Sequence, residues 1–192
     1  MLFKGCLPTR QFLEREPIAL TRMFSADHPI ADSDDNSGLA VGNPSRRVLR
    51  TQEDFEHGQV PETLVEAQDA IVSAQHLVIV FPLWHGTMPA LLKAFLDQVM
   101  RPGVALEYRK HGFPRGLLAG RSARLVVTMG MPALIYRWYF RAHGVRGLER
   151  SVLRFAGMAP VRETLLGMVE AANAAKRQGW LDRMRDYGRR DI

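Results

Sequence analysis

The sequence contains almost no cysteine and no long hydrophobic run. Cys6 stands alone among 192 residues, which excludes an internal disulfide and a cysteine-rich zinc site and agrees with a reducing compartment. The longest strongly apolar stretch, residues 77–84, is far shorter than the roughly 20 residues that a membrane-spanning helix needs. The first residues interrupt their apolar side chains with Lys4, Arg10 and Glu14, so the continuous apolar centre of a secretory signal is missing. We therefore expect a cytoplasmic protein without a membrane span.

Several common catalytic and binding motifs are also missing. The sequence has no GxGxxG after a strand, no GxxxxGK followed by Ser or Thr, no GxSxG and no HExxH. These absences remove the usual dinucleotide-fingerprint, P-loop, serine-hydrolase and zincin interpretations. The six histidines are scattered and lack the spacing of metal ligands, so we expect no metal site.

Negative charge is in the minority, because 20 Asp and Glu stand against 26 Lys and Arg, a net charge of +6. Much of the positive charge lies near the end, in KRQGWLDRMRDYGRR, and such a segment can attract nucleic acid or anionic cofactors. Asp182, Asp186 and Asp191 are interspersed there, which is typical of a solvated helix face. No zinc-finger, RNA-binding or basic-zipper pattern occurs, so we expect no nucleic-acid partner.

From residue 60 onward, helical and strand patterns alternate. Apolar residues recur at helical spacing in residues 60–75 and 88–99, with Thr87 as a candidate N-cap of the second helix. LVIVF (77–81) and ARLVVT (123–128) are apolar runs typical of strands that are buried on both faces. With 46% hydrophobic and 24% charged residues, a chain of this length predicts one α/β domain with a mostly parallel sheet.

The other segments complete or interrupt this alternation. Gly, Pro and charged residues predict an excursion over 101–122, between the second helix and the second strand. The aromatic segment 132–144 has no clear period. A short helix, a last strand and a terminal helix are predicted over 147–157, 158–169 and 170–187.

Two loops follow the two apolar strands, PLWHGTMP and TMGMPALIY. Ligands of open parallel sheets bind beyond the carboxyl ends of the strands, where such loops converge. Gly86 and Gly130 would let a flat polar ring approach the main chain, and Trp84 would supply a plane for it. The alternative is purely structural: the prolines of the loops shape turns and Trp84 caps the core.

The residues of these loops resemble a known family. VIVFPLWHGTMPALLKAFLDQVMRPGVALEY, followed by LLAGRSARLVVTMGMP, is similar to the flavodoxin-like NAD(P)H:quinone oxidoreductases. These include mammalian quinone reductase, bacterial drug-activity modulators and the ancillary oxidoreductases of potassium-efflux systems. The resemblance runs from about Val48 to the C-terminus, and the long proline-flanked motif is its specific part. It implies a flavodoxin-like open parallel sheet with helices on both faces.

The resemblance also implies an activity and a cofactor. NAD(P)H would deliver a hydride to a bound flavin, FMN or FAD, and a quinone or a similar acceptor would take it from the same face. One side of the flavin ring would be lined by Pro82, Leu83, Trp84 and His85. Backbone donors to the N5 and O4 region would come from Thr128, Met129, Gly130 and Met131.

Two residues are candidates for catalysis by the same resemblance. Tyr136 and His143 are similar to a Tyr and His pair that quinone reductases place over the flavin, although the spacing to His143 differs by about one residue. A phenol and an imidazole can each donate a hydrogen bond to a quinone oxygen as it is reduced. The alternative for Tyr136 is an aromatic core stripe with Trp138 and Phe140.

Residues 1–45 depart from the family pattern, and we treat them apart from the domain at 46–192. They are rich in turn formers and charges, which predicts a loop-like or poorly ordered segment. No strand leads there into a loop and helix that could hold a flavin phosphate. We hypothesise a frame-shifted or wrongly started N-terminal unit, which the coding DNA in its other two frames would test.

The resemblance leaves three functional classes open. The first is a quinone-type NAD(P)H oxidoreductase that forms a homodimer with sites at the subunit interface. The second is a low-activity ancillary subunit that contacts a membrane transporter, and the third is a defective product without the flavin phosphate site.

Overall fold

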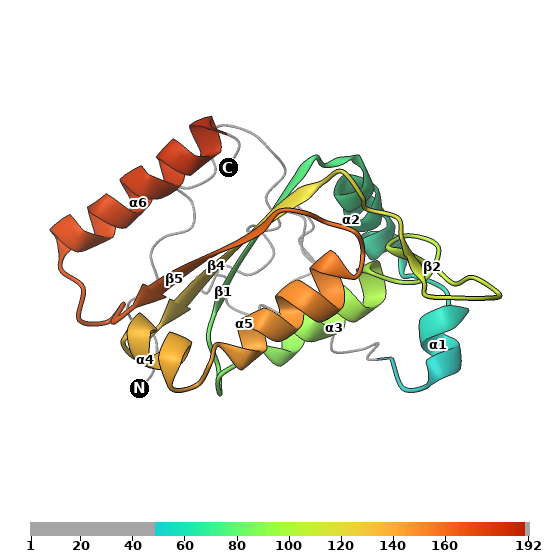
Figure 1. The fold of residues 1–192 in the computed structure, drawn as a ribbon, viewed down its shortest axis with the longest axis horizontal. Helices are drawn as coiled ribbons and strands as arrows, with labels where there is room; N and C mark the ends of the chain where they lie inside the picture. Colours follow the sequence, from blue (N-terminus) through green and yellow to red (C-terminus); the bar gives the residue numbers. More distant parts are fainter. Residues whose placement is uncertain (1–48, 191–192) are drawn as a thin grey trace, which may run out of the picture.

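The computed structural model describes residues 49–190, and its centre is a parallel sheet. The strands β1 (His76–Pro82), β4 (Ser122–Met129) and β5 (Val161–Gly167) pair in the order β1-β4-β5. All their carboxyl ends therefore lie at one edge of the sheet, which we call the carboxyl edge (Figure 1). The predicted α/β class and parallel sheet are confirmed.

Helices lie on both faces of this sheet, as expected (Figure 1). One face packs against α2 (Glu62–Ser73), α3 (Ala90–Val99), α5 (His143–Leu148) and the π-helical turn η4 (Glu149–Arg154). The other face packs against α6 (Ala174–Arg189) through a smaller apolar cluster. Two further short helices are α1 (Gln52–Glu56), which has no buried residue, and α4 (Ala133–Trp138), whose Tyr136 reaches the main core.

The two outer layers cover β1 and β4 to different extents. In β4, five consecutive residues are buried, as expected for a central strand that is covered on both faces. In β1, Leu77, Ile79 and Phe81 are buried in the main core, whereas Val78 and Val80 are half-buried beside the α6 cluster. Burial on both faces is thus confirmed for β4, whereas the second face of β1 is only half-buried. Apolar residues of α6 pack on β4 and β5, and they cover β1 only partly.

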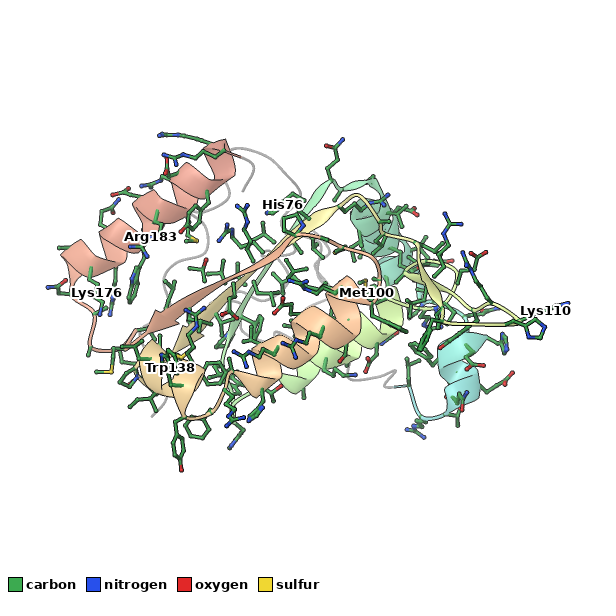
Figure 2. All side chains as sticks on the ribbon, viewed as in Figure 1. His76, Met100, Lys110, Trp138, Lys176 and Arg183 are labelled. Atoms are coloured by element: carbon green, nitrogen blue, oxygen red, sulfur yellow. The ribbon has the colours of Figure 1, made fainter. Side chains whose placement is uncertain are left out.

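Two segments show local structure that the sequence pattern did not predict. Helix α3 begins at Ala90 with Pro89 as its N-cap, so Thr87 is not the cap. The backbone of Thr87 is instead bonded in a turn with Trp84. The excursion contains the antiparallel strands β2 (Leu106–Glu107) and β3 (Arg115–Gly116), and Lys110 marks the tip between them (Figure 2).

The elements predicted after the excursion lie near their expected positions, and the short helix predicted over 147–157 contains the π-helical turn η4. Strand β5 falls within its predicted segment, and helix α6 begins within its predicted segment and extends past it to Arg189. The aromatic segment without a clear period contains α4. None of the described helices is long and apolar enough to cross a membrane. The expectations for residues 1–45 fall on residues that the structure does not describe.

Candidate functional site

The two predicted loops meet at the carboxyl edge of the sheet. We call residues 83–89, after β1, the first loop and residues 130–132, after β4, the second loop. Pro82 pairs with Thr128 in the strand register, and the amide of Leu83 donates to the carbonyl of Thr128 at 2.8 Å. The structure therefore places the beginnings of the two loops, which contain the eight residues predicted to hold a cofactor, beside each other.

The first loop is built around a tight turn. The amide of Trp84 donates to the carbonyl of Thr87 and the amide of Thr87 to the carbonyl of Trp84, each at 2.9 Å. The two residues between them have positive φ angles, 49° at His85 and 79° at Gly86, the conformation of a two-residue hairpin turn. For a residue with a side chain, such as His85, this conformation costs about 1–2 kcal/mol. Trp84 and His85 are both exposed, so the turn presents their side chains to solvent.

Neighbouring elements hold this turn in place. Tyr136, on α4, is 1% exposed, and its hydroxyl donates to the carbonyl of Gly86 at 2.9 Å. The amide of Val145, on α5, donates in turn to the Tyr136 hydroxyl at 3.4 Å. Burial raises the pKa of the Tyr136 phenol above its usual value of 10.0, so the phenol is neutral and can donate this hydrogen bond at ordinary pH.

The second loop presents backbone groups, rather than side chains, to a possible ligand. The carbonyl groups here already accept hydrogen bonds. The amide of Met168 donates to the carbonyl of Met131, and the amide of Val169 donates to the carbonyl of Met129 at the end of β4, each at 3.2 Å. Within the described residues, the amides of Gly130 and Met131 donate to no protein acceptor. Gly130 is exposed, and a Cβ atom built there would meet only the Glu170 Oε1 atom, at 3.9 Å. The loop thus has two free donors and room beside them.

The remaining predicted residues take different positions. Thr128 is half-buried, and the side chain of Met129 is buried in the main core. Met129 can therefore contact a ligand at the carboxyl edge only through its backbone. His143 is exposed at the start of α5. Its neighbour Gly144 packs on Gly86 and Thr87, so Tyr136 and His143 both lie on elements that contact the first loop. Their roles as donors to a substrate stay predictions.

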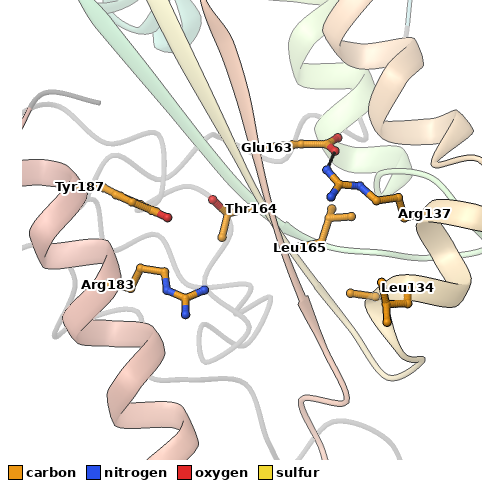
Figure 3. A pocket seen from close by; sticks show the side chains of 8 residues that line it. Leu134, Arg137, Glu163, Thr164, Leu165, Arg183 and Tyr187 are labelled. Carbon is orange, nitrogen blue, oxygen red and sulfur yellow. Dashed lines mark hydrogen bonds and ion pairs between the residues drawn. The ribbon is translucent and has the colours of Figure 1, made fainter.

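A shallow hollow elsewhere on the surface contains none of the predicted residues. It lies along the outer side of β5, between α4 and α6 (Figure 3). An ion pair between Arg137 and Glu163 lines it, together with Arg183 and Tyr187. These residues lie along the middle of β5 and on the helices beside it, rather than on the loops at the carboxyl edge, so the hollow is separate from the candidate site.

Two glycines that shape the loops could not be recognised from the sequence pattern. A Cβ atom on Gly144 would lie 2.4 Å from the carbonyl oxygen of Gly86. A Cβ atom on Gly167, the last residue of β5, would lie 2.4 Å from the amide nitrogen of Ala133, just beyond the second loop. Both positions show that each loop is in close backbone contact with another element. Such long-range contacts leave no trace in local sequence spacing.

Comparison with known proteins identifies the family. A family described as having a flavodoxin-like fold matches residues 13–187. The NAD(P)H:quinone oxidoreductase of Methanothermobacter marburgensis has a similar structure, with a TM-score of 0.59 and 25% identity over 76% of each chain. Ribosyldihydronicotinamide dehydrogenase [quinone] of Pongo abelii is 27% identical over 161 residues, which are 79% of this chain and 67% of that protein.

Other relatives match a shorter part of the chain. FMN-dependent NADH:quinone oxidoreductase 2 of Pseudomonas fluorescens is 38% identical over 65 residues, 34% of this chain and 32% of that protein. Across four relatives of this name, the aligned part spans 32–40% of the relative's length. The family match, by contrast, extends over most of the chain and agrees with the parallel sheet and its helices. The chain therefore belongs to the family of proteins with a flavodoxin-like fold.

Proposed function

We propose that this chain is an FMN-dependent NAD(P)H oxidoreductase that reduces quinones or similar acceptors by two electrons. The observation that carries the proposal is the pairing of the two loops at the carboxyl edge. One loop has an exposed indole, and its neighbour has two free backbone amides beside a glycine. A flavin, when bound, would supply the hydride chemistry, accepting from NAD(P)H and passing to the acceptor.

The residues of the two loops fit the ring of a flavin. The Trp84 indole can pack along the flat ring, and the absence of a side chain at Gly130 lets the ring approach the main chain. The amides of Gly130 and Met131 would donate to the N5 and O4 region, where negative charge develops on reduction. His143 remains our candidate donor to the acceptor oxygen, because it is exposed beside the first loop.

The names of relatives support the choice of cofactor and acceptor. Several are called FMN-dependent NADH:quinone oxidoreductases, which favours FMN over FAD and a quinone as the acceptor. The residues that would hold the flavin phosphate are not among those described at the carboxyl edge. A cytoplasmic location stays a prediction.

We also propose that the protein is a homodimer. Large apolar side chains are exposed near the carboxyl edge, on α4: Leu134 is 69% exposed and Trp138 is 76% exposed (Figure 2). Phe113, between β2 and β3, is 90% exposed. Exposed apolar groups gathered on one helix are typical of protein interfaces. Analytical ultracentrifugation tests this, since a Trp138→Glu variant should sediment as a monomer while the wild type sediments as a dimer.

Anaerobic spectroscopy tests the proposed activity. The purified chain is loaded with FMN, freed of excess cofactor and mixed with NADH or NADPH without oxygen. We expect the yellow flavin absorption to bleach and to return when a quinone is added. A folded chain that binds no FMN would contradict the proposal, and so would bound FMN that NADH and NADPH both fail to reduce. Either outcome would favour an ancillary or an inactive protein.

A further inference from the structure

We propose that Tyr136 is a positioning residue that, together with Gly144, fixes the turn at His85 and Gly86 as a rigid wall of the site. The catalytic consequence of this inference rests on the proposed function, but the contact itself does not. Tyr136 would then act through the first loop and not by donating a hydrogen bond to the substrate.

The burial of Tyr136 sets it apart from the rest of its helix. It is the one residue of α4 that is buried, at 1% exposure, whereas Leu134, Ile135 and Trp138 are exposed. The Tyr136 ring belongs to the main core, so the core of the protein fixes its position. A side chain held in this way can brace whatever its hydroxyl touches.

The hydrogen bonds of the hydroxyl connect three elements. The proton of the Tyr136 hydroxyl is donated to the Gly86 carbonyl, and a lone pair of its oxygen accepts from the Val145 amide. Helix α4, the first loop and helix α5 therefore meet at one oxygen atom. Direct donation to a substrate would require this partly buried hydrogen bond to the Gly86 carbonyl to be broken first, and the new hydrogen bond would have to compensate for its loss.

Gly144 closes the contact from the side of α5. A Cβ atom there would lie 2.4 Å from the Gly86 oxygen and 2.6 Å from the Thr87 Cα atom, distances that no side chain tolerates. Gly147, three residues along the same helix, has no atom within 4 Å of such a Cβ. The close approach of α5 to the turn thus depends on a glycine at position 144 and not on glycine in this helix in general.

The contacts of Tyr136 and Gly144 with this turn, which we call the clamp, explain how the strained turn keeps its shape. His85 has a φ of 49°, a conformation that persists only when its surroundings impose it. The hydrogen bond from Tyr136 holds the carbonyl group of Gly86. Because Gly144 packs so closely against this carbonyl group, it has no room to rotate toward α5. The exposed side chains of Trp84 and His85 are thereby fixed before any ligand arrives.

Amide hydrogen exchange of the chain without added flavin tests the clamp. Tyr136→Phe keeps the buried ring and removes the hydroxyl, and Tyr139→Phe removes an exposed hydroxyl from the residue that follows α4. We expect Tyr136→Phe to raise the exchange rates of the Trp84 and Thr87 amides by about tenfold, which corresponds to the loss of one hydrogen bond, and Tyr139→Phe to leave them unchanged. Unchanged exchange in Tyr136→Phe would overturn the proposal.

A glycine pair gives an independent second test. Gly144→Ala should raise the same exchange rates and Gly147→Ala should not, and Gly144→Ala should also weaken FMN binding several-fold. Unaltered exchange and affinity in Gly144→Ala would overturn the proposal. So would a Tyr136→Phe variant with a lower kcat but with wild-type exchange and FMN affinity, because that result identifies a direct donor. If the wild type binds no FMN, the exchange rates still decide the clamp, while the proposed function fails separately.

Discussion

The two loops at the carboxyl edge are neighbours but are built in opposite ways. The first loop uses its main chain internally, in the turn between Trp84 and Thr87, and presents side chains. The second loop has a glycine at its start and keeps the amides of Gly130 and Met131 free. A ring bound between them would find a side-chain wall on one loop and backbone donors on the other.

The difference shows how rigidity is distributed at the site. The first loop is braced by the hydroxyl of Tyr136, which the main core holds. The second loop is braced through its carbonyls and by the close packing of Gly167, so its amides remain available. Both braces are contacts within the described fold, one from the buried Tyr136 and one from the end of β5, so the site can be shaped before a ligand binds.

The largest effect should come from the brace of the second loop. Gly167→Ala places a Cβ atom 2.4 Å from the amide nitrogen of Ala133 and 2.8 Å from the carbonyl oxygen of Met131. Because backbone must move to relieve this contact, we expect the free energy of unfolding to fall by about 1–3 kcal/mol in urea denaturation. Gly179→Ala, on α6 with no atom within 4 Å, is the control and should stabilise the protein or change nothing.

The side-chain wall should be tested by removing its indole. We expect Trp84→Ala to weaken FMN binding by up to about tenfold, because a stacked aromatic ring contributes roughly 0.5–1.5 kcal/mol beyond its buried area. The affinity is measured from flavin fluorescence during titration. Phe155, which is 43% exposed and precedes β5 at the opposite edge of the sheet, supplies the control Phe155→Ala. Equal FMN affinities in the two variants would show that the indole does not contact the ring.

In the second loop, one added methyl group should lower the affinity for FMN. A Cβ atom at Gly130 meets nothing closer than 3.9 Å, so Gly130→Ala should change the free energy of unfolding by less than about 0.5 kcal/mol. The methyl group would nevertheless stand where the ring approaches the amides, so we expect FMN affinity to fall a few-fold. A loss of FMN affinity without a loss of stability would distinguish the role of Gly130 in binding from the role of Gly167 in bracing the loop. Unchanged affinity would place the ring elsewhere.

The smallest effect should be a change in the dependence of stability on pH. Burial raises the pKa of Tyr136 above its usual value of 10.0, so the folded state favours the neutral phenol. This contribution is fully present below about pH 10 and is lost as the pH rises through the higher folded-state pKa. Above pH 10, the free energy of unfolding measured by urea denaturation should therefore fall more steeply with pH in the wild type than in Tyr136→Phe. Tyr139→Phe should follow the wild type. Parallel curves for all three proteins would contradict this.

The parts of the fold that depend on local pattern could be predicted from the sequence. Apolar periodicity placed the helices α2, α3 and α6 and the three parallel strands, and the order of these elements placed both loops at one edge. The same pattern overestimated the burial of β1, because the run LVIVF cannot show that α6 covers its second face only partly. A continuous apolar run establishes a strand, but neighbours distant in sequence decide how its faces are covered.

The candidate site residues were predicted from the resemblance, and their interactions could not be predicted. Tyr136 was expected either over the flavin or in a core stripe with Trp138 and Phe140. The structure buries its ring and leaves Trp138 exposed, and the Tyr136 hydroxyl bonds a carbonyl of the first loop. Thr87 had the right residue type for an N-cap, but its backbone was needed to close the turn. In both cases a contact between separate segments overrode a local preference.

A titration of the intact wild-type chain with FMN tests the central claim most directly, with flavin fluorescence as the signal. If the two loops form a flavin site, the signal should saturate at one flavin per chain, and NADH or NADPH should then bleach the bound cofactor without oxygen. A chain that circular dichroism shows to be folded, yet that leaves the fluorescence of FMN unchanged throughout the titration, would contradict the account.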